Sequence, residues 1–370
     1  MSGADLDGTG VQVERRGALG LITLDRPRKL NALTHTMVLE IRAALDVWAV
    51  DDAVRTVLLR GVGEKAFCAG GDIVGLHRDA TRGDGRAAAA FWRDEYRLNA
   101  LIARYPKPIV ALMHGIVLGG GVGLSAHASH RVVTATTRIG MPETGIGFIP
   151  DVGGTWLLSL APGELGTHLA LTGGTVGAGD ALALGLADAY VPAERFDDIV
   201  LSLESERADV AIARLSDAAP SAPLLAQQPW IDVAYAGDDP VAIVARLEAL
   251  AEPDAREAAA AILRSSPSAV AVTLDAMRAA RGMPDLEHAL AAEFRLALRA
   301  LVAPDFAEGV RAQVIDKDRA PRWSPARLEL LDPAAVAGAA APLTDAERER
   351  FGVEEWTPLE SESRGRVVAR

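Results

Sequence analysis

Two carboxylates stand among glycines and prolines near the middle of the chain. Glu143 follows a proline inside the segment 141–154, and Asp151 lies eight residues later, just before a pair of glycines. Two glycine-rich turns come earlier, Gly70-Gly71 and Gly119-Gly120-Gly121. Acids combined with exposed backbone N–H groups are the parts needed to polarise a carbonyl and to move a proton. The sequence therefore predicts an enzyme that handles acyl groups.

The second glycine turn is the better candidate for an oxyanion site. It follows an apolar segment, 109–113, and we expect a helix to open near Gly120. Glycine lets a ligand approach the backbone closely, and the first turn of a helix carries unpaired N–H groups. The alternative is that these glycines only let a helix pack tightly against a sheet.

The acidic residues each have a structural alternative. Burial would raise the pKa of Glu143 towards neutrality and suit it to proton transfer, whereas a solvated turn carboxylate would be inert. Asp151 is either a second active acid or the N-cap of the next helix. Asp72 can cap a helix after the first glycine pair. Cys68 has no histidine placed by the sequence to activate it, so we expect a packing role.

Other catalytic and cofactor motifs are absent from the sequence. Gly61-Val-Gly63 lacks the third glycine of a dinucleotide fingerprint, and no phosphate-binding G-x-x-x-x-G-K-[ST] segment occurs. The stretch Gly123-Leu-Ser-Ala-His127 fails the last position of a nucleophile elbow. The histidines show no paired ligand spacing with Cys, Asp or Glu, so we expect no metal site. They are residues 35, 77, 114, 127, 130, 168 and 288.

Composition narrows the function classes further. The 370-residue chain has a net charge of −12, which disfavours nucleic-acid binding. Its single cysteine cannot form an intrachain disulfide, which fits a reducing, cytoplasmic location. The polar, acidic start does not resemble a secretory signal. The longest apolar run, 115–126, is too short and too rich in glycine to span a membrane.

Strand and helix patterns alternate over the first two hundred residues and predict an α/β fold. Beyond Pro192 the strand signals fade. We expect a flexible terminus (1–10), a core (11–205), a mostly helical region (206–356) and a mobile tail (357–370). Connections are expected at 216–223 and 227–237. The predicted strands are 20–24, 54–59, 108–113, 131–135 and 187–191, and the predicted helices begin near 34, 86, 120, 155 and 178.

Several ordered motifs together resemble the crotonase (enoyl-CoA hydratase/isomerase) superfamily. They lie at 24–33, 66–73, 115–121 and 142–154. Within it, the elements His114–Ser125 and Met141–Gly154 are similar to those of the 3-hydroxyisobutyryl-CoA hydrolase subfamily. The resemblance extends into 308–323 and so covers nearly the whole chain.

This resemblance implies a crotonase-like spiral of repeated β-β-α units followed by a C-terminal helical region. It implies hydrolysis of a short branched 3-hydroxyacyl-CoA thioester, 3-hydroxyisobutyryl-CoA, in valine breakdown, with no metal, nicotinamide or flavin. Coenzyme A would be part of the substrate, and the protein would often form homo-oligomers, commonly trimers.

The resemblance also implies roles for individual residues. The N–H groups of Gly71 and Gly120 would form the oxyanion hole, and Glu143 would be the catalytic carboxylate. Asp151 would be the hydrolase-associated acid near the hydroxyl-bearing acyl end. The remaining substrate-binding positions are expected to be Lys29, near the CoA phosphates, Ala69, Asp72 and Gly119.

One position departs from the hydratase pattern. A hydratase typically carries a second glutamate in the glycine-rich helix turn, where this chain has Gly123. The departure favours hydrolysis. An enoyl-CoA hydratase or isomerase that works with one glutamate remains the first alternative, and a non-catalytic acyl-CoA-binding protein is the second.

Overall fold

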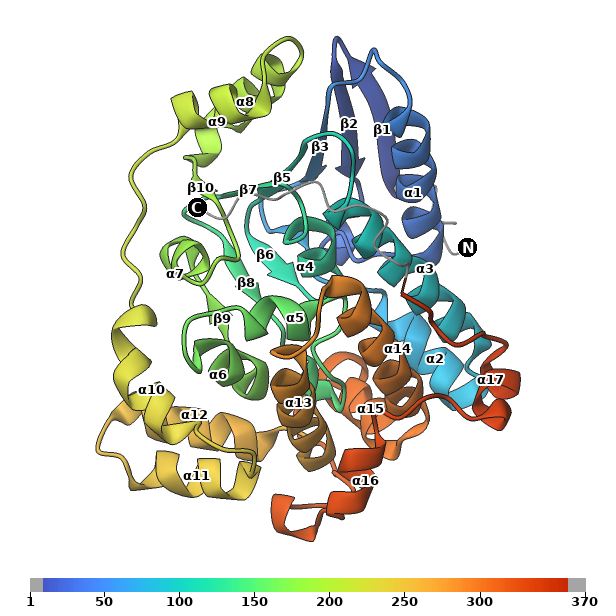
Figure 1. Ribbon diagram of the computed structural model, residues 1–370, viewed down its shortest axis with the longest axis vertical. Helices are drawn as coiled ribbons and strands as arrows, with labels where there is room; N and C mark the ends of the chain where they lie inside the picture. The colour runs from blue at the N-terminus through green and yellow to red at the C-terminus, as the bar shows by residue number, and fades with distance from the viewer. Residues whose placement is uncertain (1–8, 359–370) are drawn as a thin grey trace.

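The computed structural model describes residues 9–358, which form two β-sheets surrounded by helices (Figure 1). The expected terminus 1–10 and tail 357–370 therefore lie almost entirely outside the described residues. The chain alternates strands and helices up to Tyr190 and is helical after that. The predicted α/β class is confirmed.

The larger sheet carries the strands that the sequence predicted. Its spatial order is β1-β2-β3-β5-β7-β10. The first two strands pair antiparallel, and each later neighbour pairs parallel. The bounds are β1 Val11–Arg16, β2 Leu19–Leu24, β3 Thr56–Gly61, β5 Ile109–Met113, β7 His130–Val133 and β10 Ala189–Tyr190.

Both faces of this sheet are buried, which explains its continuous apolar strands. On one face, side chains such as Ile22, Leu59 and Ala111 join the main hydrophobic core. On the other face, alternate residues such as Leu21 and Val110 pack beneath two helices, α8 (Phe196–Leu203) and α9 (Ala208–Leu215).

The smaller sheet places the glycine turns. Its order is β4-β6-β8-β9, with β4 Ala66–Cys68, β6 Ile116–Leu118, β8 Arg138–Gly140 and β9 Thr175–Val176. The pairs β3–β4, β5–β6 and β7–β8 each give one strand to the larger sheet and the next to the smaller one. The chain therefore winds as a spiral of β-β-α turns. Because β4 and β6 are parallel neighbours, the turns that follow them meet at one edge.

The helices of the spiral begin where the local sequence provides a cap or a glycine. Thr34 accepts a hydrogen bond from Met37 N at 3.2 Å and caps α1, and Asp72 accepts one from Gly75 N at 3.3 Å and caps α2. The helices are α1 His35–Ala49, α2 Ile73–Arg82, α3 Arg86–Ala103, α4 Gly120–Ser125, α5 Gly154–Ser159, α6 Leu165–Thr172 and α7 Ala178–Ala183.

The C-terminal helices pack back onto the spiral. Helix α13 contacts α5 and α6, and α14 contacts α3, so one hydrophobic core runs through both regions. The bounds are α10 Gln228–Ala234, α11 Pro240–Ala249, α12 Pro253–Arg264, α13 Pro267–Ala280, α14 Leu286–Val302, α15 Pro304–Val310, α16 Pro333–Gly338 and α17 Asp345–Phe351.

The expected connection at 227–237 is wrong, because it contains helix α10. Pro229 lies in the first turn of this helix, where proline is tolerated because its missing N–H would have no intrahelical partner. Ile231 and Ala234 bury one side of this helix against the core.

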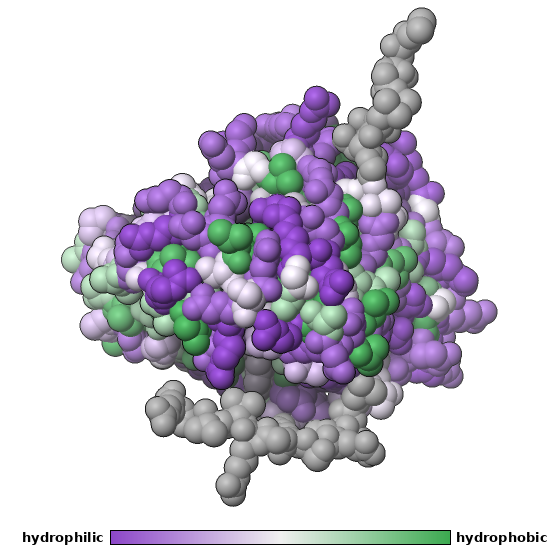
Figure 2. Space-filling view, turned by 90° about the horizontal axis from the view of Figure 1, so that it is seen from above, coloured by the Kyte–Doolittle hydropathy of each residue, from purple (hydrophilic) through white to green (hydrophobic). Residues whose placement is uncertain are grey.

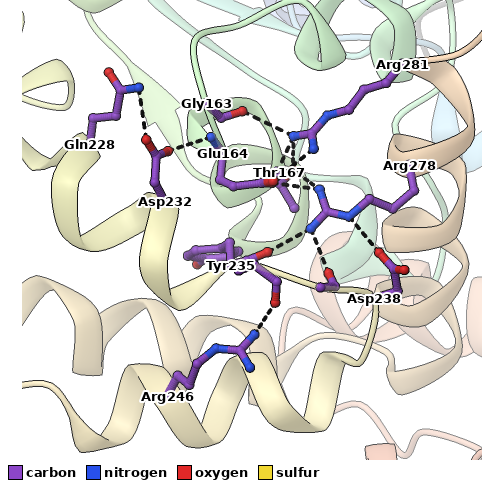
Figure 3. A network of polar contacts seen from close by, with 12 residues as sticks. Gly163, Glu164, Thr167, Gln228, Asp232, Tyr235, Asp238, Arg246, Arg278 and Arg281 are labelled. Carbon is purple, nitrogen blue, oxygen red and sulfur yellow. Dashed lines mark hydrogen bonds and ion pairs between the residues drawn. The ribbon is translucent and has the colours of Figure 1, made fainter.

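A polar network joins α10 and α13 to the spiral (Figure 3). Glu164, at the N-terminus of α6, accepts hydrogen bonds from Arg278 at 2.7 Å and Arg281 at 2.9 Å, both from the segment that contains or directly follows α13. Asp232 of α10 accepts one from Glu164 N at 2.8 Å. Arg278 also donates to Tyr235 O at 2.7 Å.

The face shown in Figure 2 is mostly hydrophilic, with hydrophobic residues in small separate groups. Across residues 9–358, no helix has the length and apolar character needed to cross a membrane.

Candidate active site

The two glycine turns lie against each other. A Cβ atom placed on Gly120 would be 3.4 Å from Gly71 N, and one placed on Gly70 would be 3.7 Å from Gly120 N. This proximity follows from the parallel pairing of β4 with β6. The backbone N–H groups of Gly71 and Gly120 are thus brought to one place.

Both N–H groups are left unpaired by the local backbone. Leu33 N–H donates to Gly70 O and Asp72 N–H donates to Leu33 O, each at 2.8 Å, so the intervening Gly71 N–H is not used by this bridge. Gly120 is the first residue of α4, where an N–H has no intrahelical acceptor. Two donors without acceptors are the elements of an oxyanion hole.

Carboxyl groups lie directly behind the turn. Gly119 has φ 47°, and a Cβ on it would lie 2.8 Å from Glu143 Oε1. A Cβ on Gly120 would collide with Glu95 Oε1. The glycines therefore make room for buried carboxyl groups, and the same close packing leaves their backbone N–H groups accessible for the predicted oxyanion role.

Glu143 is buried beside this turn. It begins a short 3-10 turn, Glu143–Ile146, and is only 7% exposed, which excludes the solvated-turn alternative. Its Oε2 atom has no hydrogen-bond partner within the described residues. Burial raises the pKa of Glu143 well above its usual range, and the charge of Asp151 adds to the effect.

Asp151 is held by a side chain from another helix. Its Oδ2 atom accepts a hydrogen bond from Tyr96 Oη of α3 at 2.7 Å, and burial raises its pKa to about 7. It is not the N-cap of α5, because that position is occupied by Gly153. The next residue, Val152, has φ 54°, an uncommon conformation for a β-branched residue.

Two further carboxyl groups belong to this cluster and were missed by the sequence analysis. Glu95 of α3 is 2% exposed, and its Oε1 atom has no partner within residues 9–358. Burial raises the pKa of Glu95 well above its usual range, and the charge of Asp151 raises it further. Its signal was present in the sequence: a glutamate on the helix face that also buries Phe91, Trp92 and Tyr96.

Glu293 of α14 is the other missed carboxyl group. It is 1% exposed and accepts hydrogen bonds from Gly153 N at 2.6 Å and from Thr155 N at 3.0 Å. Burial raises its pKa to about 8, against the lowering effect of these donors. No local pattern in the sequence connects α14 to a turn 140 residues earlier.

The cluster contains no positive charge. None of Glu95, Glu143, Asp151 and Glu293 forms an ion pair with any lysine or arginine in the described part of the chain. Within that same part, no group of three or more His, Cys, Asp or Glu side chains has an arrangement that could hold a metal ion. Burial without a cation raises the pKa values of all four carboxyl groups, which suits them to proton transfer near neutral pH.

The other predicted positions lie on segments near the β4 turn, and their role in binding substrate stays a prediction. Ala69 N donates to Leu30 O at 3.0 Å, which brings the exposed Lys29 close to the β4 turn. Asp72 serves as the cap of α2 and lies 3.6 Å from Arg26. Cys68 is fully buried, and burial raises its thiol pKa to about 12, which supports a packing role.

A pocket of about 240 Å³ opens next to Gly71. Phe91 forms part of its wall and lies 3.2 Å from the position of a Gly71 Cβ. Leu33, Leu76 and Ala88 also line it, so its wall is largely apolar. None of the four carboxyl groups lines this pocket.

Comparison with known proteins identifies the family. A family model described as enoyl-CoA hydratase/isomerase matches residues 19–339. A Danio rerio protein named 3-hydroxyisobutyryl-CoA hydrolase, mitochondrial, is 38% identical over 87% of this chain and 86% of its own length. The Homo sapiens protein of that name is 36% identical over 86% and 85%. The chain belongs to the enoyl-CoA hydratase/isomerase family.

Solved structures of this family share the fold. A carnitinyl-CoA dehydratase from Mycobacterium thermoresistibile matches with a TM-score of 0.88 and 47% identity, over 91% of this chain and 97% of that one. An enoyl-CoA hydratase from Rhodobacter sphaeroides matches with a TM-score of 0.85 and 46% identity, over 90% and 98%. The predicted crotonase-like spiral is therefore confirmed.

The hydratase position at Gly123 is physically closed in this member of the family. A Cβ there would lie 2.7 Å from Val152 Cβ and 2.8 Å from Asn99 Nδ2. A glutamate does not fit without moving the Asp151 turn. The second buried glutamate near the glycine turns is instead Glu95, which comes from a different helix.

Proposed function

We propose that the protein hydrolyses a short branched 3-hydroxyacyl-CoA thioester, namely 3-hydroxyisobutyryl-CoA, to 3-hydroxyisobutyrate and CoA, as a step of valine breakdown. The observation that carries this proposal is the position of Glu143, whose Oε1 atom lies 2.8 Å from a Cβ site on Gly119, next to the paired Gly71 and Gly120 N–H groups. The names of the Danio rerio and Homo sapiens relatives support the choice of reaction and substrate.

In the proposed reaction the thioester oxygen sits between the N–H groups of Gly71 and Gly120. These donors stabilise the negative charge that grows on oxygen as the carbonyl carbon is attacked. Loss of one such donor typically costs about 3–4 kcal/mol of transition-state stabilisation. Glycine at both positions keeps the donors open to the substrate.

Glu143 acts on the carbonyl carbon by one of two routes. As a nucleophile, its carboxylate displaces CoA thiolate and forms an anhydride, which water then opens to regenerate the carboxylate. As a general base, it takes a proton from water while the water oxygen attacks and the C–S bond breaks. ¹⁸O from labelled water in the Glu143 carboxyl after turnover would establish the first route, because that oxygen exchanges only when water opens an anhydride at the Glu143 carbonyl carbon.

Asp151 and Glu95 act at the acyl end of the substrate. Their raised pKa values keep a proton available in the cluster near neutral pH, so one of them can donate a hydrogen bond while another carboxylate accepts one. We assign Asp151 to the substrate hydroxyl. Lys29, Ala69, Asp72 and Gly119 are proposed to contact the rest of the CoA thioester.

The remaining features of the proposal concern the setting of the enzyme. The reaction uses no metal, nicotinamide or flavin, and it takes place in the cytoplasm, as the single buried cysteine suggests. The vertebrate relatives are named mitochondrial. The protein binds an acyl-CoA and does not bind nucleic acid or a membrane. It assembles as a homo-oligomer, commonly a trimer in its family.

A second candidate function has a specific observation in its favour. The two solved structures described above are titled dehydratase and hydratase, and they are more similar in sequence to this chain than the hydrolase relatives are. Enoyl-CoA hydration with one glutamate is therefore the alternative. The closed space at Gly123 weighs against it.

Thiol release separates these functions. Purified protein is incubated with 3-hydroxyisobutyryl-CoA and with crotonyl-CoA, and free CoA is followed with a thiol-trapping dye. Catalytic release of thiol from the first substrate is expected. Loss of crotonyl-CoA absorbance without thiol release would establish the hydratase instead, and binding of both esters without turnover would indicate a non-catalytic protein.

A further inference from the structure

Two consecutive residues of helix α14 contact the surroundings of Asp151. Glu293 accepts three hydrogen bonds from the turn, from Gly153 N at 2.6 Å, Thr155 N at 3.0 Å and Thr155 Oγ1 at 2.5 Å. Phe294 packs edge-on against Tyr96, with ring centroids 6.1 Å apart. Tyr96 is the residue that donates to Asp151.

The Asp151 turn depends on these contacts because its backbone is unusual. Val152 has φ 54° and Gly153 has φ 80°, so the chain reverses through left-handed conformations directly after Asp151. A non-glycine residue keeps such a conformation only when its surroundings over-determine it. Besides Glu293, the surroundings include His127, whose Nε2–H donates to Val152 O at 2.7 Å.

The burial of Glu293 without a cationic partner also indicates its role. It is a fully buried carboxyl group with no cationic partner within residues 9–358, and both of its oxygens are used as acceptors from the turn. Burying an acid at such a place is costly. A carboxyl group offers an acceptor oxygen to each of the two backbone N–H groups, whereas the neutral glutamine offers only one, so the acid fits this turn better than its neutral counterpart.

We propose that Glu293 is a positioning residue for thioester hydrolysis. It fixes the main chain from Val152 to Thr155, and so sets the direction in which the Asp151 carboxyl faces Glu143 and the glycine turns. Phe294 assists by holding the Tyr96 ring. This proposal rests on the proposed function. It assigns part of the active-site geometry to the C-terminal helical region.

The test is a comparison of kcat and KM in matched variants. Glu293→Gln keeps the shape but replaces one acceptor with an NH₂ group that faces a backbone N–H. Because misplacement of a group by about 1 Å can cost about 10²-fold in rate, we expect kcat to fall about 10- to 100-fold with KM within about threefold. Because Glu293 is proposed to act through the turn, binding should be largely retained.

Glu164→Gln is the matched control. Glu164 also joins a helix N-terminus to the C-terminal region, but it makes no hydrogen bond to residues 151–155 among the described contacts. Its substitution should lower the melting temperature and leave kcat of the folded protein unchanged. If both variants lose the same fraction of kcat, a general loosening explains the result and the proposal is overturned.

A second pair of variants tests the same proposal if Glu293→Gln does not fold. Thr155→Val removes only the hydroxyl donor to Glu293, and Thr155→Ser retains it. We expect a severalfold loss of kcat in Thr155→Val and near wild-type kcat in Thr155→Ser. Equal kcat in both overturns the proposal. Wild-type protein without thioester cleavage would instead overturn the proposed function itself, and with it this role.

Discussion

Two clusters of acids in this molecule contrast in their partners. In the network of Figure 3, burial would raise the pKa of Glu164, but hydrogen bonds from Arg281, Thr167 and Arg278 outweigh burial and lower it. In the carboxyl cluster of the candidate active site, Glu143 is buried without a cation and its pKa is raised well above its usual range. The arginine network around Glu164 therefore holds helices together, whereas the carboxyl cluster around Glu143 keeps protons available for transfer.

The difference shows where this protein departs from what stability alone would select. Burial of an acid with arginine partners satisfies its charge and contributes to a defined packing. Burial of several acids near one another raises the cost of ionising each of them. Such an arrangement is typical of a functional site, where local rules of stability are broken for chemistry.

The largest expected effect comes from removing the central acid. Glu143→Gln should lower kcat for thioester hydrolysis by about 10²–10⁴, the usual range for loss of a general acid or base. The same change should leave the melting temperature equal or higher, because it removes a buried carboxyl group with an unpartnered oxygen. Thiol release and thermal unfolding measure the two effects. Near wild-type turnover would show that Glu143 has no catalytic role.

A slightly smaller loss is expected from closing the oxyanion turn. Gly120→Ala places a Cβ against Glu95 Oε1 and 3.4 Å from Gly71 N, and we expect kcat to fall by about 10²–10³. The control is Gly338→Ala in α16, where a Cβ meets nothing within 4 Å. The control should keep full activity. Equal kcat in Gly120→Ala and Gly338→Ala would show that the glycine turn has no part in catalysis.

The opposite behaviour is expected in the arginine network. Glu164→Gln should lower the free energy of unfolding by about 1–3 kcal/mol, because it weakens charge-assisted hydrogen bonds to two arginines. Turnover per folded molecule should stay within about twofold of wild type, since surface or network changes remote from the chemistry alter kcat little. Denaturant unfolding and thiol release provide the measurements. A large loss of kcat with unchanged stability would show that Glu164 acts in catalysis and does not stabilise the fold, which contradicts the proposed difference between the two clusters.

How much of this contrast the sequence could predict depends on the distance between the residues along the chain. The glycine turns, Glu143 and Asp151 lie within short motifs, and their local spacing predicted both the turns and the acids. The motif order also predicted the spiral. Short strands such as β6 and β9 were not predicted, because two or three residues carry no periodic pattern.

Glu95 and Glu293 show why the rest could not be predicted. Each lies on a long helix whose pattern indicates only which face is buried. That a glutamate occupies such a face is visible in the sequence, but the acids it meets there depend on how the helices pack. The spatial neighbours of Glu293 are 138 and 140 residues away.

The smallest expected effect is the pH dependence of stability, and its sign tests the cluster directly. Asp151 and Glu293 have pKa values of about 7 and about 8 in the folded protein, above those of unfolded carboxyl groups. The folded state therefore binds more protons than the unfolded state between about pH 4 and 8, and stability should fall as pH rises through this window. A single group with such a shift changes the free energy of unfolding by about 1 kcal/mol between pH 6 and 7.

Chemical denaturation at pH 6 and pH 8 measures this dependence. Asp151→Asn should flatten it, because the variant removes one of the groups that take up a proton on folding. Glu164→Gln should not flatten it, since the pKa of Glu164 is lowered and the carboxylate is already ionised across this range. If stability rises from pH 6 to pH 8, the buried acids are ionised and paired in the folded protein. The carboxyl groups of the two clusters would then have the same protonation state, and the contrast between them would be wrong.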